Sequence, residues 1–314
     1  MSTTANPQAD PQAAESHLTD AEIAELAHPK ESPKARIGRV ASYVGMGLIV
    51  LYCIIPFYWM VVSSLRLPSE GRSTEFIPSP ASLENYVGVF SGTNNFGRSL
   101  INSLIVSGST TILTLLFGIV AAYALARLSF RGKGGVLWLI MACSMFPLII
   151  LIPPLLKMFS STEPFEWFPR WIDTYQAVII PGLSFGLPLA VWNLTAFFRQ
   201  LPVELEQAAM VDGCTPGVAF RKVILPLAAP GVFTTAIIVF IGAWNEYLLA
   251  LTFLQAPDKQ TATVAISKFT GTTGFDTPYG SIMAAGVIVT VPLLIAVLIF
   301  QRRIVAGLTA GGVK

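Results

Sequence analysis

Six long apolar runs, separated by polar segments, dominate the sequence. Each run reaches about 20 residues, the length that an α-helix needs to cross a hydrocarbon core of about 30 Å. We therefore expect an all-α membrane protein in which residues 41–302 form a six-helix transmembrane domain, with polar tails at 1–40 and 303–314. The predicted spans lie at residues 41–64, 99–126, 135–157, 176–198, 229–254 and 280–301.

The composition supports this assignment. The chain has 314 residues, of which 53% are hydrophobic and only 12% are charged, too apolar a mixture for an ordinary soluble domain. The cysteines are divided between spans and a loop, and the histidines precede the first run, so we expect neither a disulfide framework nor a metal site. A net charge of +2 indicates little about partners. We expect contact with membrane lipid and none with nucleic acid.

The placement of Lys and Arg predicts the orientation. Segments on the same side as the N-terminus carry more of these residues near the span ends than the opposite segments do. Under the positive-inside rule, both termini and residues 200–226 are then cytoplasmic, in a multi-pass protein of the cell membrane. No small-residue cleavage site follows the first run, so we expect it to stay as the first helix.

The N-terminal tail, residues 1–40, is rich in Ala, Glu, Gln, Ser and Pro, and it cannot bury enough apolar surface to order itself. We expect disorder there, apart from a short helix that the capping-box pattern of Thr19–Glu22 would start. A regulatory or docking helix is the alternative interpretation of this pattern.

Three outer segments, 66–98, 159–175 and 256–279, are candidates for contact with an external partner. The first contains proline turns followed by an amphipathic piece that Ser82 would N-cap. We expect this piece to form a helix that lies on the membrane surface.

Polar residues within the spans are candidates for a solute path. Asn102 heads a group of small and hydroxyl residues in the second span, which either pack helices closely or line a path. The third and fourth spans are interrupted by prolines, which fits a cavity-forming bundle or simple kinks. Glu246 is the charged residue that lies well inside a span, and Trp244 and Asn245 directly precede it. It is by default a functional candidate, although a position at the outer interface or a structural hydrogen bond would also explain it.

Residues 204–226 form a polar, helix-prone segment between two apolar runs. They begin with helix formers, acidic residues and small residues, followed by a Gly-Cys-Thr-Pro-Gly break at 213–217 and a second, basic helix from Pro216 to Val223. A segment built in this way predicts a docking surface.

Several kinds of chemistry are missing from the sequence. It contains no GxxxxGK[ST] phosphate loop, no HExxH helix and no GxSxG elbow, so we expect neither an enzyme nor a bound cofactor. It also lacks the paired acids and bases within the spans that a proton-coupled carrier would use. If a solute crosses here, the energy should come from another subunit.

The central segment resembles a known motif, the EAA loop of ABC importer membrane subunits. That family pattern is Glu-Ala-Ala, three residues, Gly, nine residues, then Ile, any residue, Leu and Pro. The chain matches its spacing with Gln207-Ala208-Ala209, Gly213 and Val223-Ile224-Leu225-Pro226. Two positions depart from the pattern, because Gln207 replaces the glutamate and Val223 replaces the isoleucine. The resemblance implies that the family's glutamate forms an ion pair with the ATPase subunit. In this chain, either Glu206 or Glu204 would supply the acid for that ion pair, or Gln207 would form a hydrogen bond in its place.

The resemblance extends from about residue 40 to the end of the chain. FIPSPASLENY, the Ala-Arg pair at 126 and 127, AFFRQLPVELEQAAMVDG, AWNEYLLAL and GLTAGGVK are similar to segments of maltose-type carbohydrate importer permeases. Within that group, the chain is most similar to the six-span permease of trehalose and maltose importers. This resemblance implies the type I ABC importer permease fold.

The resemblance also implies partners and site residues. They are a second, homologous permease, two copies of an ATPase that bind ATP and Mg²⁺, and an external lipid-anchored or periplasmic sugar-binding protein. The residues expected to couple to the ATPase are Glu204, Glu206, Gln207, Ala208, Ala209, Asp212 and Gly213. Those of the tail expected to contact it are Leu308, Thr309, Gly311 and Gly312.

The function implied is the import of a trehalose- or maltose-like disaccharide, driven by ATP hydrolysis on the partner subunits. The candidate substrate path consists of Trp244, Asn245, Glu246 and Asn102, although the second permease could carry the entire sugar site. Alternative cargoes are glycerol phosphate, a polyol or another oligosaccharide. A stand-alone secondary carrier is a remote alternative, and it would transport without partners.

Overall fold

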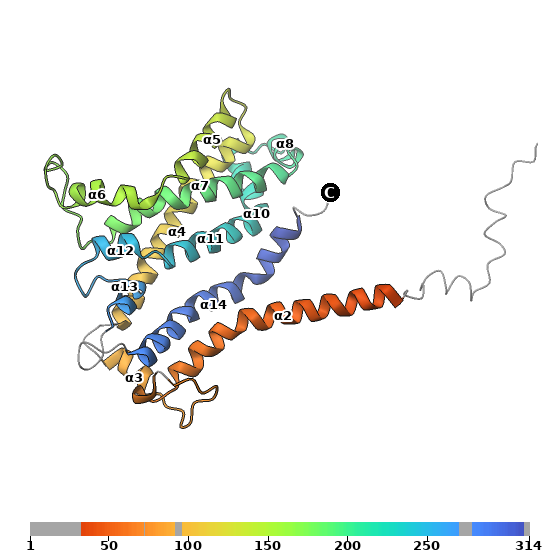
Figure 1. The fold of residues 1–314 in the computed structure, drawn as a ribbon. Helices are drawn as coiled ribbons and strands as arrows, with labels where there is room; N and C mark the ends of the chain where they lie inside the picture. The colour runs from red at the N-terminus through yellow and green to blue at the C-terminus, as the bar shows by residue number, and fades with distance from the viewer. Residues whose placement is uncertain (1–32, 72, 92–95, 270–277, 311–314) are drawn as a thin grey trace, which may run out of the picture. The chain divides into compact units, whose positions relative to one another are not determined.

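The computed structural model describes residues 33–71, 73–91, 96–269 and 278–310, which are mostly helical and contain no strand (Figure 1). The chain divides into two compact units, residues 1–58 and 59–314. The helices are α2 (Pro33–Ser64), η3 (Pro68–Glu70), α3 (Glu84–Ser91), α4 (Phe96–Arg127), α5 (Lys133–Ser144), α6 (Leu148–Phe159), α7 (Gln176–Gln200), α8 (Glu204–Val211), α9 (Pro216–Ala219), η4 (Phe220–Ile224), α10 (Leu225–Leu227), α11 (Ala229–Trp244), α12 (Leu248–Phe253), α13 (Ala262–Ser267) and α14 (Tyr279–Ala310).

Four of these helices are long and apolar enough to cross a membrane on their own. They are α4, α7, residues Arg36–Ser64 of α2 and residues Tyr279–Phe300 of α14. Two pairs of shorter helices pass the same test only when combined, so the described residues contain four spans, or up to six if each bent pair counts as one. The predicted all-α membrane fold is confirmed.

The third predicted span, 135–157, is broken, as its prolines indicate. Helices α5 and α6 occupy this run, and their axes meet at 82°. The break falls at Pro147, which adopts an extended conformation and precedes the first residue of α6. Proline lacks an amide hydrogen and disfavours helical geometry in the residue before it, so the bend follows from the sequence.

The fifth predicted span, 229–254, is also interrupted. Helix α11 ends at Trp244 and α12 begins at Leu248. The backbone N–H groups of Leu249 and Ala250 donate to the carboxylate of Glu246, at 2.8 and 3.0 Å. The side chain thus satisfies the free amides at the start of α12, as an N-capping residue does.

The first and last described helices are longer than predicted. Helix α2 begins at Pro33 instead of residue 41. Proline fits the first turn of a helix because the backbone N–H groups of that turn have no acceptor within the helix, so the lack of an N–H costs nothing there. Helix α14 continues through Ala310, beyond the predicted end at 301. The capping-box pattern at Thr19–Glu22 lies outside the described residues.

The predicted helix in the first outer segment is confirmed. The backbone N–H of Glu84 donates to the Ser82 hydroxyl at 3.1 Å, and α3 follows. One side of α3 packs against α14, and Asn85 is buried and donates to the carbonyls of Ser64 and Arg66. Its position on the membrane surface stays a prediction. The guanidinium of Arg66 in turn donates to the carbonyls of Ser73 and Glu75, so this outer segment is held by its own polar groups.

The centre of the second unit is the pairing of α4 with α7, and α11 packs against both (Figure 1). Small residues allow the two helices to approach closely. A Cβ atom added to Gly118 would lie 3.3 Å from the Ala190 Cβ, and one added to Gly186 would lie 3.0 Å from the Thr114 hydroxyl. For these residues, the packing interpretation of the small and hydroxyl residues is correct.

Gly231 of α11 provides a test of this close packing. An added Cβ would lie 2.3 Å from the ring of Phe197, whereas one added to Gly242 of the same helix meets nothing within 4 Å. We expect Gly231→Ala to destabilise the protein by about 1–3 kcal/mol because the ring has to move. Gly242→Ala is the matched control and should not destabilise it. Thermal unfolding of the purified variants in detergent measures the difference, and equal melting temperatures would contradict the prediction.

Candidate functional site

The first candidate site is the segment from Glu204 to Pro226, which folds as two helices joined by a tight turn. Helix α8 ends at Val211, and Gly213 has a φ of +87°, a left-handed conformation that favours glycine. The N–H of Gly213 donates to the Met210 carbonyl and that of Cys214 to the Ala209 carbonyl, at 3.1 and 3.0 Å. This is the C-terminal cap that a glycine after a helix predicts.

The second helix is longer than predicted. It begins after Thr215, whose carbonyl accepts from the N–H groups of Val218 and Ala219 at 2.9 Å. The chain then continues through α9, the π-helical stretch η4 and α10 to Leu227, where it bends by 71° into α11. The segment from Glu204 to Pro226, called the docking segment below because a docking role is predicted for it, is therefore joined directly to the next apolar run.

An aromatic cluster packs against this second helix. The Phe220 ring lies 4.4 Å from the Tyr123 ring and 6.3 Å from that of Phe198, between ring centroids. Ile224 and Ala228 are buried in the same core. Since Tyr123 belongs to α4 and Phe198 to α7, the segment rests on the ends of the two central helices.

Helix α8 is fixed to the same helix ends by polar contacts. The Arg127 Nε and a Glu206 carboxylate oxygen lie 3.5 Å apart, a charge contact without hydrogen-bond alignment. The Tyr123 hydroxyl donates to the other oxygen of Glu206. Arg127 also donates from Nη2 to the Leu201 carbonyl at 2.9 Å. These contacts connect α4, the end of α7 and α8.

The predicted coupling residues fall on two faces of the segment. Glu204, Gln207, Ala208, Asp212 and Gly213 are exposed. Glu206 and Ala209 are buried within the chain itself. Ala209 therefore packs within the chain, and the Glu206 carboxylate contacts Tyr123 and Arg127 instead of lying on the exposed face beside Gln207. The role of both residues in coupling stays a prediction. The exposed face also carries Val211, which is 87% accessible, and Met210.

The tail residues can be placed only in part. Leu308 and Thr309 belong to the helical backbone of α14. Gly311 and Gly312 lie outside the described residues.

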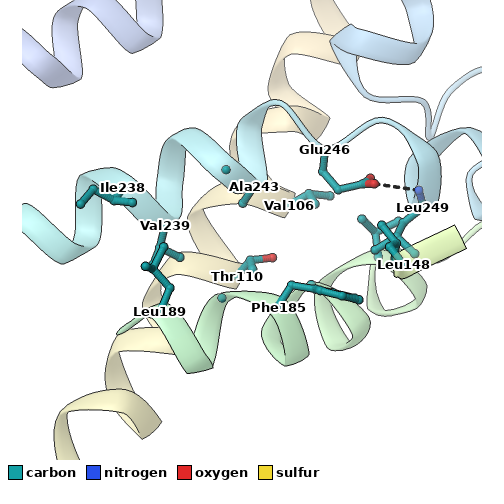
Figure 2. A pocket seen from close by; sticks show the side chains of 14 residues that line it. Val106, Thr110, Leu148, Phe185, Leu189, Ile238, Val239, Ala243, Glu246 and Leu249 are labelled. Atoms are coloured by element: carbon teal, nitrogen blue, oxygen red, sulfur yellow. Dashed lines mark hydrogen bonds between the residues drawn. The ribbon is translucent and has the colours of Figure 1, made fainter. Parts of the chain in front are cut away.

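The second candidate site is a cavity of about 210 Å³ between α4, α7 and α11 (Figure 2). Its wall is almost entirely apolar, and its polar groups are the Thr110 hydroxyl and the Glu246 carboxylate. The ring of Phe185 forms one side. The lining residues are Val106, Thr110, Leu148, Val178, Gly182, Phe185, Gly186, Leu189, Ile238, Val239, Gly242, Ala243, Glu246 and Leu249.

Glu246 combines two of the interpretations that its sequence position left open. It faces the cavity, and it makes the structural hydrogen bonds to the start of α12 that are described above. Its own carbonyl accepts from the Thr263 hydroxyl at 3.0 Å. The carboxylate is thus held in position where it faces the cavity.

The other predicted path residues do not line the cavity. Trp244 is buried, and the exposed Asn245 donates to the carbonyl of Ile241, at 2.8 Å. Gly242, Ala243 and Glu246 line the cavity, whereas Trp244 and Asn245 do not.

Asn102 has a structural role instead. It is fully buried, and its amide nitrogen donates to the carbonyls of Asp258 and Gln260, each at 2.9 Å. Its amide oxygen accepts from the Tyr175 hydroxyl at 2.7 Å. An amide with these three bonds fastens the loop before α13 to α4 and to the residue before α7, and Asn102 does not line the cavity. That it contacts the substrate stays a prediction.

Sequence reasoning did not assign Phe185 to this site. Gly182 and Gly186 were available as a signal, because two small residues four positions apart open one face of a helix. Phe185 lies beside that opening, next to the cavity.

Comparison with known proteins gives consistent matches. Residues 114–309 match the family model described as binding-protein-dependent transport system inner membrane component. The trehalose transport system permease protein SugB of Mycobacterium tuberculosis is 46% identical, over 85% of this chain and 94% of that protein. The trehalose/maltose transport system permease protein MalG of Thermococcus litoralis is 39% identical, over 88% of this chain and 97% of that protein.

A third relative carries a different name. The sulfoquinovosyl glycerol transport system permease protein SmoH of Agrobacterium fabrum is 37% identical, over 88% of this chain and 94% of that protein. Among solved structures, a chain of a bacterial ABC transporter involved in alginate import matches with a TM-score of 0.71 at 20% identity. The match covers 87% of this chain and 99% of that chain, and it supports the fold.

The role of Asn102 can be tested by replacing it with leucine, which has a similar branched shape but forms no hydrogen bonds. The change leaves the two carbonyls and the Tyr175 hydroxyl without partners, and each buried unsatisfied group costs about 1–3 kcal/mol. We expect Asn102→Leu to lower the melting temperature of the purified protein strongly. Asn245→Ala, which removes an amide bonded only within its own helix, should lower it little. Similar losses in both variants would contradict the assignment.

Proposed function

Because this chain belongs to the family of binding-protein-dependent transport system inner membrane components, we propose that it is the permease subunit of an ATP-driven importer for a trehalose- or maltose-like disaccharide. The names of the two relatives at 46% and 39% identity support this cargo. The chain is a transport subunit and not an enzyme, and it crosses the membrane several times.

The observation that carries the coupling role is the build of the segment from Glu204 to Pro226. It exposes acidic, small and apolar side chains on one face, and on the other it is fixed to α4 and α7. The sequence has no phosphate-binding loop of its own. An external ATPase that covers the exposed face is therefore the partner that this segment fits.

In the proposed mechanism, ATP and Mg²⁺ bind to two copies of this ATPase, and their closure displaces α8. A sugar-loaded binding protein contacts the outer segments 66–98, 159–175 and 256–279. A second, homologous permease completes the transmembrane path. The permeases alternate between two states, and the ATPase and the binding protein bias that equilibrium without chemistry in this chain. Both termini lie in the cytoplasm, and the tail that includes Leu308 and Thr309 contacts the ATPases.

The cavity beside Glu246 is the part of the path that this chain contributes. An aromatic ring and a fixed carboxylate suit a sugar, which presents apolar faces and hydroxyl donors. Phe185 would contact a sugar face, and Glu246 would accept a hydroxyl hydrogen bond. The second permease supplies the remaining polar contacts, since only Thr110 adds another polar group on this side.

A second cargo class is favoured by the sulfoquinovosyl glycerol relative, at 37% identity. A glycerol-containing or polyol cargo would use the same fold and the same coupling. Calorimetry on the binding protein of the system distinguishes the two classes, because it reports which ligand is delivered.

Gly213 tests the coupling role. Gly213→Val places a β-branched residue at a φ of +87°, where a side chain costs about 1–2 kcal/mol, and so reshapes the turn between the two helices. We expect ATP-dependent uptake of labelled trehalose by the reconstituted complex to fall about tenfold or more. Gly132→Val is the matched control, since Gly132 has a φ of +89° and equally open space but lies before α5. Full uptake by the Gly213 variant at normal expression would contradict the proposed coupling role.

Filling the cavity tests the path. Gly242 lines the cavity and an added Cβ there meets nothing within 4 Å, so Gly242→Leu projects a side chain into free space. We expect uptake to fall about tenfold while the complex still assembles. Gly108→Leu introduces the same side chain in α4, away from the cavity, and should transport normally. Equal uptake by both variants would remove the cavity from the path.

A further inference from the structure

Glu206 differs from the other acidic residues of the docking segment because it points into the chain. Its side chain is only 12% exposed, and that of Arg127 is only 10% exposed. Its neighbour Gln207 and the acids Glu204 and Asp212 are all exposed. Within α8, the side facing solvent could therefore bind a partner, whereas the opposite side makes an internal polar contact through Glu206.

The contact partners of Glu206 both belong to α4. The Tyr123 hydroxyl donates to one carboxylate oxygen, and the Arg127 guanidinium faces the other. Arg127 also reaches the Leu201 carbonyl, which lies between the last residue of α7 and the first of α8. Three chain segments thus meet at one buried pair of charges.

Apolar packing would hold these segments together at lower cost. Burial of an ion pair removes two charges from water, and its attraction only repays this penalty in good geometry. What the pair adds is directionality: it fixes where α8 sits relative to α4, and it resists sliding, because a separated buried charge is strongly unfavourable. The aromatic cluster of Tyr123, Phe198 and Phe220 supplies packing but no such fixed register.

We propose that Glu206 is a positioning residue that locks α8 to α4 through Tyr123 and Arg127, so that a displacement of α8 moves the α4–α7 pair as one body. This inference rests on the proposed coupling function and deepens it. Gln207 and its exposed neighbours meet the partner, whereas Glu206 transmits the movement to the membrane helices. The helices α4 and α7 pack closely at Gly118 and Gly186, so we expect them to move together when α8 is displaced.

The test uses the complete reconstituted transporter with Glu206→Gln, Arg127→Gln and the double variant. Glutamine keeps the size of glutamate and can still accept from Tyr123, but it removes the charge pair. We expect sugar transported per ATP hydrolysed to fall about fivefold or more in each single variant, with no further fall in the double variant. Arg131→Gln is the matched control, because Arg131 is exposed four residues beyond Arg127, and it should keep the wild-type ratio.

A purely structural role would reduce the amount of assembled complex and leave the ratio of transport to hydrolysis unchanged. That result, or additive losses in the double variant, would overturn the proposal. If the wild-type complex itself shows no ATP-dependent uptake, the proposed function fails instead.

A distance measurement keeps the inference testable in that case. Spin labels on Ala208 of α8 and Leu116 of α4, both exposed, report the position of α8 in the full chain in lipid nanodiscs after the native cysteines are replaced. We expect a narrow distance distribution in the wild type and a broader one with Glu206→Gln. Identical distributions would show that the pair does not hold α8.

Discussion

Within a hydrocarbon layer, a backbone group without a hydrogen-bond partner is costly, so every break in a spanning helix needs an internal substitute. This constraint explains two of the polar side chains that were candidates for a solute path. Glu246 serves the free amides where α11 gives way to α12. Asn102 serves two carbonyls of the loop before α13. These two side chains therefore satisfy backbone groups, and Glu246 also faces the cavity.

The same constraint makes α4 the reference element of the second unit. Near its N-terminal end it holds the loop before α13 through Asn102 and Ser103, whose hydroxyl accepts from the Ala262 N–H at 2.8 Å. Near its C-terminal end it holds the segment Glu204 to Pro226 through Tyr123 and Arg127. Between the two ends it lies against α7 over small residues. An element tied at both ends and packed closely along its length can carry a displacement from one side of the membrane to the other.

The sequence predicted features that depend on local chemistry. Apolar run length gave the spans, Ser82 gave the start of α3, and the spacing around Gly213 gave the turn of the docking segment. It could not predict features that depend on distant partners. Glu206 and Gln207 are adjacent and similar in size, and the inward one contacts Tyr123 and Arg127, which are far away in the sequence. The break at Asn245 to Tyr247 was equally hidden, because the carboxylate that stabilises it resembled a substrate ligand.

The inward position of Glu206 also changes what a partner can recognise. With that charge neutralised inside the chain, the acidic groups left on the face of α8 and its turn are Glu204 and Asp212, at opposite ends of the helix. Between them the face presents the amide of Gln207 and the apolar side chains of Met210 and Val211. Exposed apolar side chains of this kind are stable in water only at a cost that burial against another protein recovers. In the docking role proposed above, contact along this face of α8 would depend on shape and apolar area, and the acidic groups of the face would act at its two ends.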